Sequence, residues 1–172
     1  MPYNPNIHHR RSIRLKGYDY SQAGLYFVTI NVQDRKHLFG KIVNGEMIIN
    51  DAGQMVETEW LALPERFQNI ELHEFIVMPD HFHGILEIKG QPQGIVPASG
   101  KTVGDMMDAF KSIVTVEYIR GVKTLGWKPF NGKLWQHNYY EHIIRDEQSY
   151  QNISDYIRNN PSKWQDDKFF QQ

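Results

Sequence analysis

Cysteine is absent from this chain of 172 residues, which excludes disulfide bonds and thiolate metal sites. Any bound metal must therefore be held by histidine, carboxylate or amide groups, and this ligand set favours Mg²⁺, Mn²⁺ or a similar ion over a structural zinc. The sequence also lacks an apolar run long enough for a membrane-spanning helix and an apolar N-terminal signal segment. We therefore expect a cytoplasmic protein that does not associate with membranes.

An excess of charge of either sign is missing as well, since 19 basic and 20 acidic side chains give a formal net charge of −1. This balance argues against a uniformly basic nucleic-acid-binding surface. The positive charges are unevenly placed, however, because residues 1–18 contain Arg10, Arg11, Arg14 and Lys16 and no acid. The pattern predicts a basic N-terminal arm that touches a phosphate backbone, with a solubilising tail as the alternative interpretation.

The composition is otherwise that of an ordinary globular protein, with 40% hydrophobic and 23% charged residues. A chain of this length favours one domain with a sizeable core. We place that domain at residues 19–165, between the arm at residues 1–18 and a short tail at residues 166–172.

Strands and helices are predicted to alternate along the domain. Runs rich in β-branched and aromatic residues predict strands at residues 24–32, 70–78, 81–88 and 133–144. The pair Asn44-Gly45 predicts the turn of a small hairpin. Helical spacing of apolar residues predicts helices at residues 51–63, 102–120 and 147–160. We expect Asp51 to cap the first helix, Gly121 to end the second and Pro161 to close the third.

The order of these elements indicates the fold class. Strand, helix, strand, strand, helix, strand and helix follow one another, which is typical of a ferredoxin-like α+β sandwich with a central antiparallel sheet. The hairpin is then a small insertion, and the last helix is an extra C-terminal element that packs near the sheet.

The triplet His81-Phe82-His83 begins one of the predicted strands. Side chains alternate between the faces of a strand, so His81 and His83 share one face while Phe82 turns into a core on the other. Two imidazoles held side by side on a strand form half of a site for a divalent metal. Two structural histidines at a strand end are the alternative interpretation.

The final helix carries a phenol and an amide one turn apart. Tyr156 lies about 100° around the helix from Ile157, which belongs to the apolar face. Asn160 follows four residues after Tyr156 and therefore lies on the same side. A phenol can act as a nucleophile, although its reference pKa of about 10 requires a metal or cation nearby at neutral pH. A packing tyrosine and a helix-capping asparagine are the alternatives.

Three motifs follow one another along the chain: Met78-Pro79-Asp80-His81-Phe82-His83-Gly84, then Leu134-Trp135-Gln136 with Tyr140-Glu141-His142-Ile143-Ile144-Arg145, and finally Asp155-Tyr156-Ile157-Arg158-Asn159-Asn160-Pro161. In this order and spacing, the set resembles the single-tyrosine HUH transposases. That family comprises small insertion-sequence transposases and their domesticated relatives, the REP-associated tyrosine transposases. The resemblance extends over about residues 8–165.

The resemblance implies a role for each half of the predicted site. His81 and His83 would bind Mg²⁺ or Mn²⁺, Asn160 would be the third ligand, and Tyr156 would be the nucleophile. The implied enzyme nicks and joins single-stranded DNA near hairpins through a covalent 5′-phosphotyrosine intermediate. It needs no nucleotide cofactor, because the covalent link stores the bond energy.

The resemblance also implies single-stranded or hairpin DNA as the partner. The candidate DNA-binding residues are Arg11, Arg14, Lys16, His142 and Arg145. Insertion-sequence relatives are often dimers that exchange the tyrosine helix, whereas domesticated ones can act as monomers, so a homodimer is compatible with the resemblance.

Three other functions remain open at this point. A nicking endonuclease that initiates replication or conjugation is the nearest, although such enzymes often use a pair of tyrosines. A non-catalytic module that binds hairpin DNA would keep the fold without the chemistry. A metal-dependent hydrolase would use activated water, with Tyr156 only packing.

Overall fold

The computed structural model describes residues 22–90 and 101–166. The predicted basic arm, the loop at residues 91–100 and residues 167–172 of the predicted tail lie outside these described ranges.

A four-stranded antiparallel sheet forms the centre of the molecule, in the order β4-β5-β1-β6. Strand β1 (Gly24–Asn31) lies between β5 (His81–Ile88) and β6 (Tyr140–Ile144), and β4 (Ile70–Met78) pairs with the other edge of β5. This order is the one that two interlocked β-α-β units produce. The predicted ferredoxin-like α+β sandwich is therefore confirmed.

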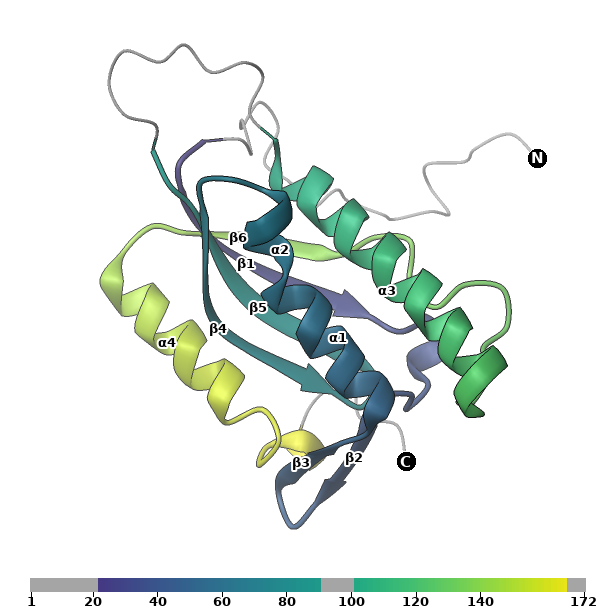
Figure 1. The fold of residues 1–172 in the computed structure, drawn as a ribbon. Helices are drawn as coiled ribbons and strands as arrows, with labels where there is room; N and C mark the ends of the chain where they lie inside the picture. The colour runs from purple at the N-terminus through teal and green to yellow at the C-terminus, as the bar shows by residue number, and fades with distance from the viewer. Residues whose placement is uncertain (1–21, 91–100, 167–172) are drawn as a thin grey trace, which may run out of the picture.

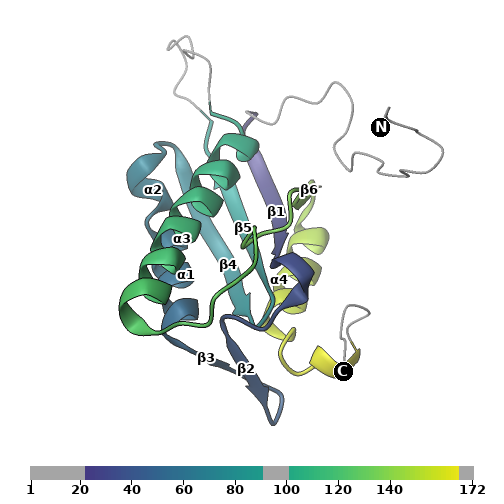
Figure 2. The same cartoon turned by 90° about the vertical axis from the view of Figure 1, so that its right-hand side faces the viewer.

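Helices cover both faces of this sheet. Helices α1 (Asp51–Leu61) and α3 (Val103–Leu125) pack on one face, and α4 (Glu147–Arg158) packs on the other (Figures 1 and 2). The shorter elements are η1 (Gln33–Arg35), β2 (Gly40–Val43), β3 (Glu46–Ile49), α2 (Leu63–Arg66) and η2 (Trp164–Asp166). Within the described ranges, no helix is both long enough and apolar enough to cross a lipid bilayer.

Two hydrophobic clusters fill the spaces between the sheet and its helices. In the larger one, under α1 and α3, the fully buried Phe82 ring lies 4.6 Å from the Trp60 ring. Burying such a side chain stabilises the fold by about 1.5–3 kcal/mol. The smaller cluster, under α4, contains Phe27, Ile85, Ile144 and Ile157. The sheet therefore has an inner face toward α1 and α3 and a second face toward α4.

The inserted hairpin forms as predicted. Strands β2 and β3 pair antiparallel, and the turn residues Asn44 and Gly45 have φ values of 51° and 76°. Both values lie in the left-handed region that a tight hairpin turn of this kind requires, which explains the Asn-Gly pair.

Several predicted boundaries were wrong, for local physical reasons. The cap of α1 is Asn50, not Asp51, because the Asn50 side chain accepts a hydrogen bond from the Gly53 amide at 2.9 Å. Helix α3 continues past Gly121 to Leu125 and ends at Gly126, whose φ is 72°. Gly121 is needed inside the helix, because a Cβ there would lie 2.1 Å from the Trp127 ring.

The last strand is also shorter than predicted. Only β6 (Tyr140–Ile144) belongs to the sheet, and the preceding residues form an irregular segment in which Trp135 makes an isolated bridge with Val32. The half-buried Lys111 ammonium donates to the carbonyls of Gln136 and His137 at 2.9 and 3.1 Å. These two backbone carbonyls accept hydrogen bonds from a side chain of α3 in place of the backbone amides of a neighbouring strand.

Candidate active site

Strand β5 presents His81 and His83 on the sheet face toward α4. Their exposed fractions are 2% and 4%, and their ring centroids lie 4.5 Å apart at an interplanar angle of 73°. Phe82 points to the opposite face and packs in the larger core. The predicted alternation is confirmed, and the two imidazoles are held side by side on a rigid strand.

Each imidazole is fixed through its Nδ1 atom. His81 Nδ1 lies 2.6 Å from Asp80 Oδ1, and His83 Nδ1 lies 2.7 Å from Thr29 Oγ1. Partners on Nδ1 leave Nε2 as the ring nitrogen that can bind a further group. His83 Nε2 is buried and has no hydrogen-bond partner among the described residues. A buried ring nitrogen without a partner destabilises the folded protein unless a bound ligand interacts with it.

Asp80 is itself held by a cation. Its side chain is 2% exposed, and its Oδ2 lies 3.0 Å from Arg35 Nε. Arg35 also donates to Asn31 Oδ1. Asp34 and Arg35 have φ values of 59° and 53°, an uncommon conformation for residues other than glycine, directly where Arg35 meets Asp80. The arrangement Arg35–Asp80–His81 fixes the orientation of the imidazole, as outer partners of metal-binding histidines do.

The electrostatics of the pair favour a neutral His83. Burial, together with the neighbouring His81 and the positive charge of Arg35, holds the pKa of His83 well below its ordinary value. A neutral imidazole keeps the nitrogen lone pair that metal coordination requires.

Helix α4 brings Tyr156 to the histidines. Asp146 caps the helix by accepting a hydrogen bond from the Ser149 amide at 2.7 Å, and Ile157 packs into the smaller core. The Tyr156 ring lies 5.2 Å from the His83 ring and 6.2 Å from the Phe27 ring, centroid to centroid. The residue is 45% exposed, so it touches His83 while part of it faces solvent.

Asn160 follows the end of α4, two residues after Arg158. The chain leaves the helix at Asn159 and continues to Trp164, whose ring stacks on His81 at 6.1 Å and 11°. Asn160 thus lies on the segment between Tyr156, which contacts His83, and Trp164, which contacts His81. It is 6% exposed, and its Oδ1 is buried with no hydrogen-bond partner among the described residues.

These atoms fit a divalent cation. An imidazole nitrogen and an amide oxygen are both buried and lack partners in the described structure, and they are the donor types that Mg²⁺ and Mn²⁺ sites can use. The residues that would hold such an ion are His81, His83 and Asn160.

The predicted DNA-binding residues fall into two groups. His142 and Arg145 are exposed at the edge strand β6 and the turn that follows it. His142 pairs with Phe27 in the sheet register and so lies on the α4 face, next to the exposed Tyr140. The other three candidates, Arg11, Arg14 and Lys16, lie outside the described residues.

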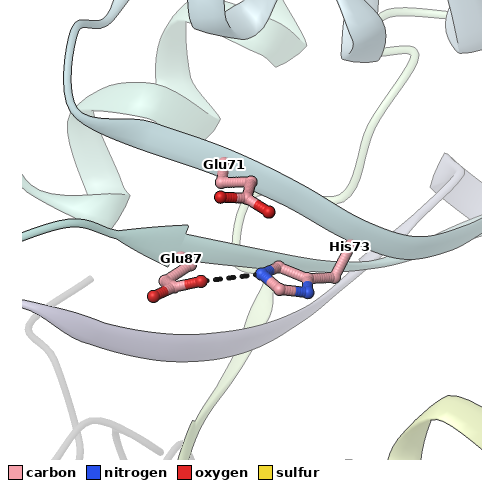
Figure 3. A group of neighbouring side chains, drawn as sticks. All are labelled: Glu71, His73 and Glu87. Carbon is pink, nitrogen blue, oxygen red and sulfur yellow. Dashed lines mark hydrogen bonds and ion pairs between the residues drawn. The ribbon is translucent and has the colours of Figure 1, made fainter.

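A second group of possible metal ligands lies farther along the same face. Glu71, His73 and Glu87 offer ligand atoms within 4.8 Å of one another, and Figure 3 shows His73 and Glu87 pointing toward each other. The Lys89 ammonium already lies 2.8 Å from Glu71 and 3.0 Å from Glu87. Although burial acts to raise it, hydrogen bonds from His73 and Lys89 hold the pKa of Glu87 below its usual value. Both carboxylates of this group are therefore already paired with the Lys89 ammonium without a metal.

Sequence reasoning missed the residues that support the histidines. Asp80 stands directly before the triplet, so its role could have been suspected from its position. Thr29 becomes visible only through the β1–β5 register, which pairs it with His83. Arg35 depends on a local backbone conformation that no simple pattern predicts. The Glu71-x-His73 alternation on one strand was a usable signal for the second group.

Comparison with known proteins adds independent information. The chain matches the sequence model of the family described as "Transposase IS200 like" over residues 49–160. It is 41% identical, over 184 aligned positions, to an uncharacterised protein of Haemophilus influenzae, with 98% of this chain and 97% of that protein covered. A candidate REP-associated tyrosine transposase of the same organism is 24% identical over 148 positions, with 84% of this chain and 74% of that protein covered.

A solved structure shows the same fold. A REP-associated tyrosine transposase bound to a REP hairpin matches with a TM-score of 0.58 and 23% identity. The match covers 88% of this chain and 74% of that chain. At this level of identity, the likeness supports the antiparallel sheet and the helices around it.

Proposed function

The chain belongs to the IS200-like transposase family. We propose that it is of the REP-associated type and that it cuts and rejoins single-stranded DNA through Tyr156. The observation that carries this proposal is the contact between the Tyr156 ring and His83, whose Nε2 is buried and without a partner in the described structure. A nucleophile beside an incomplete ligand set is the arrangement that phosphodiester cleavage requires.

His81, His83 and Asn160 are the proposed ligands of a divalent ion, Mg²⁺ or Mn²⁺. When bound there, the ion supplies Lewis-acid neutralisation of the non-bridging phosphate oxygens. Asp80 and Thr29 hold the two imidazoles in the orientation that leaves each Nε2 available. The low pKa of His83 supports this role, because a protonated imidazole cannot be a ligand.

In the proposed cleavage step, the Tyr156 hydroxyl oxygen attacks the phosphorus of a phosphodiester. A bond forms between Oη and phosphorus, and the bond from phosphorus to the 3′-oxygen breaks. The products are a 5′-phosphotyrosine and a free 3′-hydroxyl. The phenol releases a proton to solvent, which the partly exposed side chain can reach, and the departing 3′-oxygen takes one up.

Rejoining reverses these bonds. A 3′-hydroxyl attacks the phosphotyrosine, a new phosphodiester forms, and the Tyr156 oxygen leaves as a phenol. The number of phosphoester bonds is unchanged over the two steps, so no nucleotide cofactor is required.

DNA beside a hairpin is the proposed substrate. The structurally similar transposase is bound to a REP hairpin, and this supports the same class of partner for the present chain. His142 is exposed on the side of the sheet that carries Tyr156, and Arg145 is exposed directly after β6. Both are proposed to contact the strand that is cut. Arg11, Arg14 and Lys16 are proposed to contact phosphates close to the hairpin.

The experiment that tests this function uses a labelled single-stranded DNA with a hairpin, Mn²⁺ and the purified protein. After denaturation, label that migrates with the protein supports cleavage by the tyrosine. Cleaved DNA without such an adduct indicates a metal-dependent hydrolase. Binding without cleavage indicates a non-catalytic hairpin-binding module. Either of the last two results contradicts the proposal.

A further inference from the structure

Strand β4 contains a bulge on the side of the molecule that faces α4. Leu72 pairs with Leu86 and Phe75 pairs with Gly84, so two residues of β4 stand opposite the single residue Ile85. Leu72 and Phe75 both pack against the larger core, on the far side of the sheet. The bulge therefore directs two consecutive side chains, His73 and Glu74, toward the face on which α4 lies.

His73 binds the beginning of α4. Its Nδ1 lies 3.0 Å from the hydroxyl of Tyr150, and the two rings meet edge to face at 5.5 Å. Its Nε2 lies 2.8 Å from Glu87 (Figure 3). The Glu87 carboxylate is also paired with Lys89. His73 is thus held on both nitrogens, and its orientation is set from within the sheet.

Glu74 binds the end of the same helix. Its Oε1 lies 3.0 Å from the Arg158 guanidinium, which also pairs with Asp155. Side chains on a helix lean toward its N-terminus, so Arg158 reaches back to a residue next to His73. The two bulge residues consequently contact α4 at both ends, His73 at the first turn of the helix and Glu74 at its last residue.

The two contacts restrain rotation of α4 about its own axis. Tyr150, Ile153 and Ile157 form the apolar seam of the helix, and an apolar seam resists rotation only weakly because it has no directional bonds. Arg158 lies about 100° to one side of Ile157, and Tyr156 lies about 100° to the other. Fixing Arg158 to Glu74 on one flank therefore fixes the direction in which Tyr156 faces His83 on the opposite flank.

We propose that the β4 bulge positions the nucleophile, with His73 and Glu74 as positioning residues that act on Tyr156 through α4. This inference rests on the function proposed above. It assigns the Glu71, His73 and Glu87 group a structural purpose, since Glu87 and Lys89 orient His73 for its contact with Tyr150.

The test compares the wild-type protein with the double variant His73→Phe/Glu74→Met, which keeps ring packing and side-chain length but removes the polar contacts with Tyr150 and Arg158. Hydrogen exchange of the α4 amides in DNA-free protein should become about tenfold faster, while exchange in β1 and β5 is unchanged. The rate of adduct formation at saturating hairpin DNA should fall about tenfold or more, and the Kd for the hairpin should stay within about twofold. Replacing His73→Phe in the double variant by His73→Gln, which restores a hydrogen-bond donor and an acceptor at position 73, should recover part of the rate of adduct formation.

A matched control is Glu117→Gln, which breaks an exposed ion pair with Arg120 on α3. It should change neither α4 exchange nor adduct formation. Unchanged α4 exchange in the double variant, or an equal loss of rate in the control, would overturn the proposal. If the wild-type protein formed no adduct, the proposed function would fail, and the exchange measurement would still decide whether the bulge holds α4.

Discussion

His83 and Tyr156 meet with ring centroids 5.2 Å apart, although one lies in the middle of the sheet and the other on the helix that covers it. Thr29, which the β1–β5 register places opposite His83, holds that imidazole, and Ile157 packs α4 onto the sheet in the smaller core. This relationship joins the two halves of the candidate site, so each half and the contact between them can be tested separately.

Removing either histidine should remove the metal site without removing the DNA-binding surface. Loss of a residue that only orients a metal ligand weakens metal binding by about 10–100-fold. His81→Ala and His83→Ala each remove a proposed ligand, so each should weaken Mn²⁺ binding by more than this. Titration of free Mn²⁺ by electron paramagnetic resonance measures this without DNA, and hairpin binding should be largely retained. His142→Ala is the control for Mn²⁺ binding alone, since that exposed imidazole is not one of the proposed ligands. Loss of Mn²⁺ binding in Glu87→Gln but not in His83→Ala would place the ion in the other group.

Asp80 should act on the metal through His81. Asp80→Asn keeps the size of the side chain but removes the charge that pairs with Arg35 and orients the imidazole. We expect Mn²⁺ affinity to fall about 10–100-fold while the sheet remains folded. Isothermal titration with Mn²⁺ measures the affinity, and circular dichroism checks the fold. Wild-type affinity in a folded Asp80→Asn protein would show that the carboxylate does not orient His81.

Deletion of residues 1–16 tests the basic arm. If Arg11, Arg14 and Lys16 neutralise phosphates, hairpin binding should weaken and its dependence on salt should flatten. The slope of log K against log salt should decrease by about 0.7–0.9 for each phosphate that the truncated protein no longer neutralises. Fluorescence anisotropy between low and moderate salt measures both effects. An unchanged slope would make the arm a solubilising tail.

The contact between Tyr156 and His83 within one chain supports a site completed in cis. An equimolar mixture of His83→Ala and Tyr156→Phe should then form no adduct beyond the sum of the separate proteins. Denaturing electrophoresis of the mixture with labelled hairpin DNA makes the comparison. Recovery of adduct in the mixture would show that the tyrosine serves a partner chain, as a homodimer with exchanged helices requires.

The sequence predicted what periodicity and local chemistry control. Alternation placed Phe82 in the larger core and the histidines on the other face, and the Asn44-Gly45 turn formed as expected. The end of α3 was wrongly predicted at Gly121, because glycine is favoured both at a helix end and where another side chain packs closely against a helix. At Gly121 the reason is close packing, since the Trp127 ring leaves no room for a Cβ.

Longer-range contacts could not be predicted in this way. The strand at residues 133–144 was too long because Lys111, a residue of α3, uses the carbonyls before β6. The bulge of β4 depends on how β4 pairs with β5, and Thr29 enters the site only through register. In the candidate site, the sequence indicated the groups that are proposed to do chemistry, His81, His83, Tyr156 and Asn160. It did not indicate Thr29 and Arg35, which hold the histidines in place.

Mapping a covalent link between DNA and Tyr156 tests the proposed nucleophile most directly. Wild-type protein and Tyr156→Phe are incubated with hairpin DNA and Mn²⁺, and the protein is digested and mapped by mass spectrometry. If Tyr156 is the nucleophile, the wild-type peptide carries a nucleotide at Tyr156, Tyr156→Phe forms no adduct, and both proteins have the same hairpin Kd. An adduct that persists in Tyr156→Phe, or one that maps to another residue, would show that Tyr156 is not the nucleophile.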